Sequence, residues 1–140
     1  MPACIFCDIV RGERAAARVF EDEHLVSFLD HRPLFPGHML LVPRSHLATM
    51  LDAANADLGA LFAGARRAGR ALEQGLGAQG FLVAVNNRVS QSVPHLHVHV
   101  VPRTRGDGLK GFFWPRRPYR DAAHLEEVRA RLAAAAIEVG

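Results

Sequence analysis

The chain has 140 residues, 49% of them hydrophobic, and a formal net charge of +3 at pH 7. This length supports one domain with its own core, and no apolar run approaches the length of a membrane span, which excludes a membrane partner. The first residues lack the charged and then apolar regions of a signal peptide, so a cytoplasmic location is expected.

The N-terminal third is predicted to hold a short helical segment or turn and then three strands. Residues 4–10 form the helical segment or turn, with several apolar side chains available for packing. Strands are expected at residues 19–22, 25–29 and 38–42. Two prolines and a glycine punctuate residues 30–37, which are therefore expected to form a loop.

The clearest helix is expected at residues 55–74. Asp52 or Asn55 can cap its start, and Gly75 and Gly77 can end it. Glycines inside the segment each cost about 1 kcal/mol relative to alanine, which weakens the helix signal. The apolar stripe that marks this helix consists of Leu58, Leu61, Phe62, Ala65, Ala68, Gly69 and Leu72.

The C-terminal half adds two strands and a second helix. We expect strands at residues 81–85 and 95–101, separated by a loop at 86–94, and a helix at about 122–136. Three strands, a long helix and two strands lack the strand–helix alternation of a parallel sheet. The fold class is therefore predicted to be α+β, with a five-stranded antiparallel sheet, one long helix and a C-terminal helical tail.

Three histidines alternate with apolar residues in the last predicted strand. A strand places His95, His97 and His99 on one face and the intervening apolar residues on the other. A row of histidines is costly to bury without partners, so this face is expected to line a site. His95 and His99 would lie about 13 Å apart, too far to share one ligand atom. We therefore expect His97 to be the central reactive group, with a neighbour on each side.

A basic segment follows this strand, and a pair of cysteines opens the chain. Residues 102–120 carry six positive charges and one negative charge. This excess favours a patch that attracts phosphorylated substrates over a solvated basic loop with no partner. It is also compatible with binding of nucleic acid. Cys4 and Cys7 form a C-x-x-C, which is either a redox pair or half of a zinc site. The redox interpretation is disfavoured because no strand precedes the pair.

Residues 95–101 resemble the signature of histidine triad (HIT) proteins. The resemblance covers about residues 4–103 and implies a single HIT domain over residues 1–140, with a basic C-terminal extension at 104–140. Matching motifs occur in the family's usual order at Cys4-Ile5-Phe6-Cys7, Glu21-Asp22-Glu23, Phe28-Leu29-Asp30, Pro36-Gly37-His38, Val42-Pro43-Arg44-Ser45-His46, Asn86-Asn87 and Gln91-Ser92-Val93.

The resemblance implies a nucleotide hydrolase or nucleotidyl transferase that acts at the α-phosphate of a nucleoside polyphosphate or phosphoramidate. Diadenosine polyphosphates and adenylyl amides are examples of such substrates. His97 is implied to form a covalent nucleotidyl-histidine, with His99, His95 and His38 as further catalytic residues. Nucleic acid is then an unlikely partner. The alternatives are a slow or non-catalytic nucleotide-binding regulatory module, and a zinc hydrolase whose metal is held by triad histidines and His38.

By resemblance, the nucleotide contacts divide into an apolar base pocket, a carboxylate for the ribose hydroxyls and donors to phosphate. The implied nucleotide-binding residues are Phe6, Phe28, Leu29, Asp30, Leu40, Asn86, Gln91, Ser92, His97 and His99.

The resemblance also implies a structural zinc ion held by Cys4, Cys7, His46 and His95, because some branches of the family carry these four residue types at matching places. Relatives commonly form homodimers, so a homodimer is expected. Two departures stand out. The loop at 86–94 is shorter than in many relatives, and Trp114 lies in a tail outside the shared core. From its position alone, Trp114 is expected to lie against a partner's active site.

Overall fold

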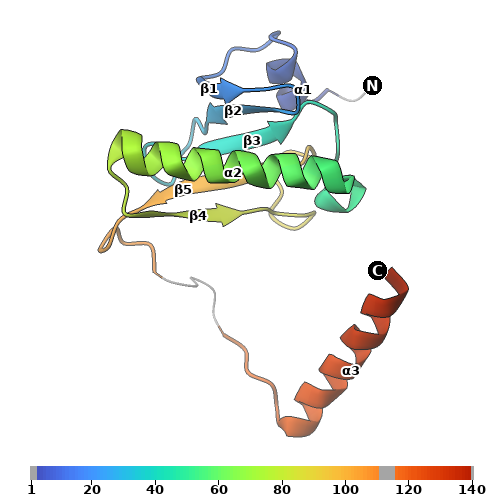
Figure 1. Cartoon of the computed structure of the whole chain (residues 1–140). Helices are drawn as coiled ribbons and strands as arrows, with labels where there is room; N and C mark the ends of the chain where they lie inside the picture. The colour runs from blue at the N-terminus through green and yellow to red at the C-terminus, as the bar shows by residue number, and fades with distance from the viewer. Residues whose placement is uncertain (1–2, 111–115, 140) are drawn as a thin grey trace. The chain divides into compact units, whose positions relative to one another are not determined.

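The computed structural model describes residues 3–110 and 116–139 (Figure 1). The chain divides into two compact units, residues 1–107 and residues 108–140. The first unit contains the sheet, and the second contains helix α3 (Ala122–Val139). The single-domain assignment with a core at 4–103 stays a prediction, and Trp114 lies outside the described residues. In the described parts of the chain, no helix is long and apolar enough to cross a membrane.

Five antiparallel strands form one sheet in the order β1-β2-β3-β5-β4. Their bounds are β1 (Arg18–Glu21), β2 (Leu25–Leu29), β3 (Met39–Pro43), β4 (Gly80–Ala84) and β5 (Val98–Arg103). Strand β5 pairs with β3 on one side and β4 on the other, so the histidine strand is central. The predicted α+β class and the antiparallel sheet are confirmed.

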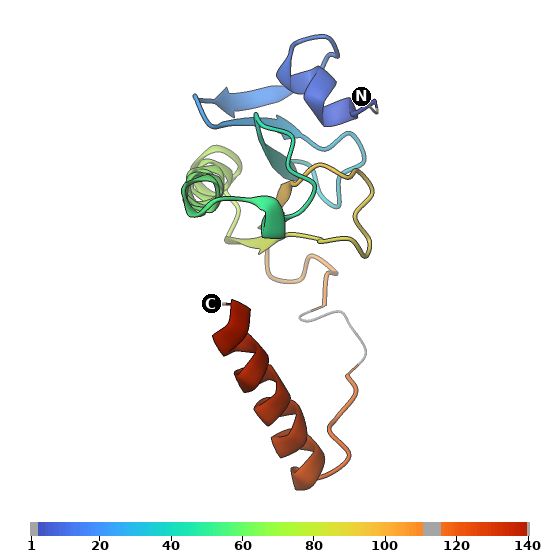
Figure 2. The ribbon, with the colours of Figure 1, turned by 90° about the vertical axis from the view of Figure 1, so that its right-hand side faces the viewer.

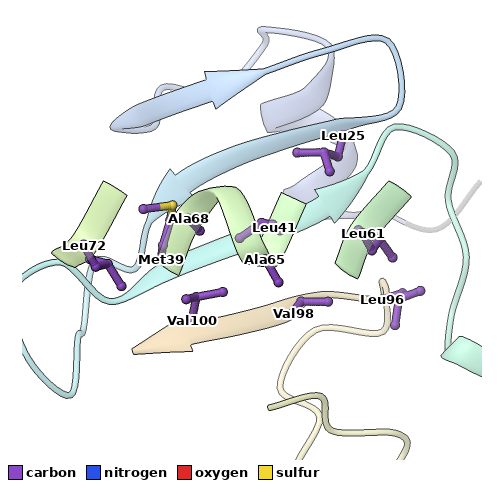
Figure 3. Close-up of a cluster of buried hydrophobic side chains, with 10 residues drawn as sticks. All are labelled: Leu25, Met39, Leu41, Leu61, Ala65, Ala68, Leu72, Leu96, Val98 and Val100. Atoms are coloured by element: carbon purple, nitrogen blue, oxygen red, sulfur yellow. The ribbon is translucent and has the colours of Figure 1, made fainter. Parts of the chain in front are cut away.

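Helix α2 (Asn55–Leu76) packs along one face of the sheet (Figures 1 and 2). Its buried stripe is made of small and aliphatic residues, and Gly64 lies so close that a Cβ there would be 2.6 Å from a methyl of Leu25 and 2.9 Å from one of Leu41. Phe62, which the predicted stripe includes, is 46% exposed because the helix approaches the sheet through Gly64 instead. Figure 3 shows the resulting core, made of Leu25, Met39, Leu41, Leu61, Ala65, Ala68, Leu72, Leu96, Val98 and Val100.

The ends of α2 follow the predicted chemistry only in part. Gly77 ends the helix with a φ of +70°, as expected. The N-terminal cap position is Ala54, whose N–H donates to the Asp57 carboxylate at 3.1 Å. Asp52 instead accepts from the Thr49 N–H at 3.0 Å and closes a short 3₁₀ turn, Met50–Asp52. The predicted caps Asp52 and Asn55 are therefore wrong for α2, because an extra turn precedes it.

The opposite face of the sheet carries α1 (Ile5–Val10) and the loops at residues 30–38 and 86–94 (Figure 2). A second hydrophobic cluster lies beneath α1. It consists of Cys4, Phe6, Ile9, Val26, Phe28, Leu40 and Val42.

The histidine strand is shifted along the chain relative to the expected 95–101, because β5 begins at Val98 and continues to Arg103. The N–H of Leu96 bonds to the carbonyl of Leu47, outside the ladder of β3. The predicted division of side chains nevertheless holds. Leu96, Val98 and Val100 all belong to the core beneath α2, which leaves the histidines for the other face.

Candidate active site

The strands bring three imidazoles together on the face opposite α2. Leu40 of β3 pairs with His99 of β5, which places His38, just before β3, beside the histidine strand. The ring centroids of His97 and His99 lie 5.0 Å apart, and those of His38 and His99 lie 5.2 Å apart. The predicted grouping of His38 with the triad is therefore seen in the geometry.

His97 is held in one tautomer by the backbone carbonyl of His95. Its Nδ1 lies 2.7 Å from the carbonyl oxygen of His95, and a carbonyl can only accept, so Nδ1 carries the proton. The lone pair is then on Nε2. Burial lowers the pKa of His97, whose residue surface is only 2% exposed, so the ring is neutral near pH 7.

His99 is held in the opposite tautomer through His38. The backbone N–H of Leu34 donates to Nδ1 of His38 at 3.1 Å, so the His38 proton is on Nε2. That Nε2–H donates to Nδ1 of His99 at 3.0 Å, which leaves the His99 proton on Nε2. Burial, with the neighbouring His97 and His38 acting in the same direction, lowers the pKa of His99 to about 4. Two adjacent neutral imidazoles thus present different groups at Nε2, a lone pair on His97 and an N–H on His99.

Asp30 lies at the edge of this group, in the loop between β2 and β3. One carboxylate oxygen is 3.7 Å from Nε2 of His38, and the other accepts from the Arg32 N–H at 2.9 Å. Its side chain is 18% exposed, so the carboxylate keeps a solvent-facing part next to the histidines.

Three of the four predicted base-pocket residues share the site's face. Phe6, Phe28 and Leu40 lie in the cluster beneath α1, and the ring of Phe6 meets that of Phe28 at 5.5 Å and that of His97 at 5.1 Å. We call these three residues the apolar wall. Leu29 alternates onto the other face of β2 and is 39% exposed, so the geometry does not place it with the wall.

The loop at 86–94 is held by its own amides. The Gln91 side chain accepts from the Arg88 N–H at 2.9 Å and donates to the Ala48 carbonyl at 2.6 Å. Asn87 accepts from the Met50 N–H at 2.8 Å. Gln91, predicted to donate to phosphate, therefore fixes the loop with at least one of its two N–H groups. Ser92 is exposed and Asn86 is half-buried.

Two residues of this loop adopt left-handed backbone conformations. Arg88 has a φ of 70° and Ser90 a φ of 60°, the non-glycine positive φ values among the described residues. These conformations are strained for residues with a side chain. The loop at 86–94, which by resemblance is shorter than in many relatives, therefore contains strained backbone conformations. The Gln91 side chain stabilises them by accepting from the Arg88 N–H.

Two cysteines and two histidines converge at the N-terminal end of the site. We call Cys4, Cys7, His46 and His95 the Cys–His cluster; their donor atoms all lie within 4.8 Å of one another. Nδ1 of His95 is 3.5 Å from each sulfur, and Nδ1 of His46 is 3.2 Å from Sγ of Cys7. Zinc bonds of about 2.3 Å to sulfur and 2.0 Å to nitrogen at tetrahedral angles separate such atoms by about 3.5 Å.

The orientation of His95 also fits a metal ligand. Its Nε2 lies 3.0 Å from the carbonyl oxygen of Pro43 and therefore donates, so the lone pair on Nδ1 points at the sulfurs. The four residues therefore bring their donor atoms close enough together to hold a metal ion.

Asp30, His38 and His99 form a second group with donor atoms within 4.8 Å of one another. Here the tautomers disfavour a metal. The Leu34 N–H keeps the proton of His38 on Nε2, the atom that would have to bind the ion. The geometry thus favours a hydrogen-bond relay over a catalytic metal held by these residues. The Leu34 amide could not be found from the sequence, because a backbone donor leaves no side-chain signal.

Comparison with known proteins finds relatives of a single family. The family model described as HIT domain matches residues 11–106. The HIT-like protein Rv1262c of Mycobacterium tuberculosis is 36% identical over 140 residues, covering 95% of this chain and 97% of its own. The adenylylsulfatase HINT3 of Arabidopsis thaliana is 32% identical over 108 residues, covering 76% of this chain and 55% of its own.

A solved structure is similar along nearly the whole chain. The zinc-bound histidine triad family protein from Mycobacterium smegmatis superposes with a TM-score of 0.74 and 36% identity, covering 95% of this chain and 97% of that one.

Proposed function

The chain belongs to the HIT family, and we propose that it is a nucleotide hydrolase or nucleotidyl transferase that acts through a covalent nucleotidyl-histidine on His97. The observation that carries this proposal is the pair of opposite tautomers. His97 offers a lone pair at Nε2, and His99 offers an N–H at the corresponding atom. A nucleophile beside a hydrogen-bond donor suits attack on a phosphoryl group.

In the proposed reaction, Nε2 of His97 attacks the α-phosphorus of a nucleoside polyphosphate or phosphoramidate. A nitrogen–phosphorus bond forms, and the leaving group departs with the electron pair of the bond that breaks. His97 becomes cationic, and the His95 carbonyl stabilises its Nδ1–H. The Nε2–H of His99 donates to a phosphoryl oxygen as negative charge develops there. Water or another acceptor then attacks phosphorus and releases its proton to solvent, the nitrogen–phosphorus bond breaks, and its electrons return to Nε2.

We propose that the remaining site residues recognise the nucleoside. The apolar wall lies against His97, where it would contact the base. Asp30, partly exposed to solvent beside His38, would accept hydrogen bonds from the ribose hydroxyls. Ser92 is exposed on the neighbouring loop and would donate to phosphate, whereas Gln91 holds that loop in place. Diadenosine polyphosphates and adenylyl amides meet these requirements.

We further propose that the Cys–His cluster holds a structural zinc ion. Two thiolates and two imidazoles match the preference of zinc, and the three sulfur–nitrogen separations of 3.2–3.5 Å are close to those of a tetrahedral site. Four protein ligands leave no position for substrate, so the ion would supply stability and not chemistry. The similar Mycobacterium smegmatis protein is zinc-bound in its crystal structure, which supports this assignment.

A homodimer is also proposed. Strand β4 is an edge strand, and Phe62 on α2 and Phe81 on β4 are 46% and 39% exposed. An unpaired edge next to exposed aromatic residues suits association with a second copy. The molar mass measured by light scattering tests this proposal, and a monomeric mass at micromolar concentration would refute it.

The covalent step is tested directly by trapping. The protein is incubated with a radiolabelled diadenosine polyphosphate, quenched in alkali and digested, and the peptides are analysed by mass spectrometry. We expect an adenylyl group on the peptide that contains His97, and its loss in His97→Ala. His31→Ala, which removes an imidazole 90% exposed to solvent, serves as the matched control. Nucleotide binding without any adduct would favour the non-catalytic regulatory module instead.

A panel of nucleotides then defines the substrate. Product analysis with and without added phosphate shows whether water or phosphate accepts the nucleotidyl group. Retained turnover in His97→Ala would remove His97 as the nucleophile, provided that the variant has the wild-type circular dichroism spectrum.

A further inference from the structure

Helix α1 connects the Cys–His cluster to the nucleophile. Cys4 and Cys7 flank Phe6 in the sequence, and the Cys7 N–H donates to the sulfur of Cys4 at 3.4 Å. The Phe6 ring meets the His97 ring edge to face, with centroids 5.1 Å apart and an interplanar angle of 81°. One short helix and the Cys4 residue that caps it therefore carry two of the four donor atoms and a side chain that packs on His97.

Apart from the Cys–His cluster, the helix is held by its apolar side chains and by one side-chain hydrogen bond to its backbone. It spans six residues, which is too short to be stable alone. Phe6 and Ile9 are its buried residues, and the Arg18 guanidinium donates to the carbonyl of Ile9 near its C-terminal end. At its N-terminal end, the donor atoms of the Cys–His cluster supply the polar contacts that fix α1 to the rest of the domain.

A second connection runs through His95. Its ring is held between the Pro43 carbonyl at Nε2 and the two sulfurs at Nδ1. Its own carbonyl accepts the Nδ1–H of His97. A displacement of His95 therefore moves the acceptor that sets the tautomer of His97.

We propose that the Cys–His cluster is a positioning device for His97, and that Phe6 is the positioning residue through which it acts. This inference rests on the proposed function of His97. With the cluster loaded, the Phe6 ring and the His95 carbonyl hold the His97 imidazole with its lone pair facing the substrate. With the cluster empty, α1 loosens and His97 samples a second orientation. The metal thus sets the rate without contacting the substrate.

The test uses ¹⁵N NMR of the His97 imidazole in nucleotide-free protein, together with the single-turnover rate of adenylylation. The wild-type chain is measured loaded with zinc, after chelation, and after zinc is returned. We expect one Nδ1–H tautomer in the loaded protein and mixed signals after chelation. The rate should fall about tenfold or more on chelation and recover on reloading, because small misplacements of a nucleophile are costly.

Two variants separate positioning from stability and from base binding. Phe6→Leu keeps all four donor residues, and we expect full zinc content, mixed His97 signals and a slower adenylylation rate at saturating nucleotide. Ile9→Val is the matched control, since Ile9 is buried in the same helix, and it should behave as wild type. A zinc-loaded Phe6→Leu protein with the wild-type tautomer and rate would overturn the proposal, as would an unchanged tautomer after chelation.

The two proposals fail in different ways. If no adduct forms in any protein but the His97 signals still respond to zinc and to Phe6→Leu, the proposed chemistry is wrong and the positioning role stands. If adducts form at equal rates in every case, the positioning role is wrong and the chemistry stands. If chelation unfolds the domain, Phe6→Leu still decides, because that variant retains its metal ligands.

Discussion

Acid should destabilise the domain through His99. Burial, reinforced by His97 and His38, lowers the pKa of His99 to about 4 in the folded protein, whereas an unfolded histidine titrates near 6.5. Between these values the unfolded chain binds more protons than the folded one. The free energy of unfolding therefore falls as pH drops below 6.5, by up to about 1.4 kcal/mol per pH unit, until the folded group also titrates. Stability from this group is fully present above pH 6.5.

The expected size of the effect follows from these two values. Between pH 7.5 and pH 5.0, His99 alone should lower the free energy of unfolding by about 2 kcal/mol. Burial also lowers the pKa values of His38 and His97, which adds to the acid sensitivity in the same direction.

Urea denaturation of wild type and His99→Gln at the two pH values isolates the contribution of His99. Gln can still accept the His38 Nε2–H but does not titrate. We expect the variant to lose about 2 kcal/mol less than wild type on acidification. Contributions of groups other than His99 are common to both proteins and cancel in the difference, and His31→Gln controls for loss of an exposed imidazole. If wild type and His99→Gln lose stability in parallel, the assignment of His99 as a buried neutral imidazole is wrong.

Further predictions concern packing and the metal. Ser27→Ala should raise the free energy of unfolding by about 1 kcal/mol, because the buried Ser27 hydroxyl has no partner among the described residues; a loss in urea denaturation would mean that the hydroxyl is paired. Gly64→Ala should lower it by about 1–3 kcal/mol, since its Cβ would meet two leucine side chains. Gly59 lies open to solvent on the same helix, so Gly59→Ala should raise the free energy of unfolding by up to about 1 kcal/mol. If urea denaturation shows changes of the same sign for the two variants, this packing is wrong. Chelation should lower the Tm and zinc should restore it, because a metal held by folded ligands stabilises the folded state; a Tm indifferent to chelation would argue against a structural ion.

The fold was largely predictable because its signals are periodic. Alternation placed Leu96, Val98 and Val100 in the core, and the structure confirms that placement. The end of α2 at Gly77 was predictable because glycine readily adopts the left-handed backbone conformation found there. The start of α2 at residue 55 was predicted correctly, but its capping residue was not. Asp52 and Asp57 have the same chemistry, and only the extra turn before the helix decides between them.

The residue types of the candidate site were predictable from the sequence, but the positions of the protons on its histidine rings were not. The sequence points to His97, and only the structure shows that a carbonyl two residues earlier fixes its tautomer. The Leu34 amide, which orients His38, has no side-chain signature at all. Leu29 was assigned to the base pocket by resemblance to the family, whereas the pleat of β2 turns it away from the apolar wall.

The central position of β5 has a consequence for how the site can change. This strand is paired along both sides, and its apolar face belongs to the main core. His99 is thus built on this strand, and the proposed nucleophile His97 directly precedes it, so local opening of the domain is expected to reach both late. New ligand preferences can arise by altering the surface loops at 30–38 and 86–94, while the reacting histidine stays where it is.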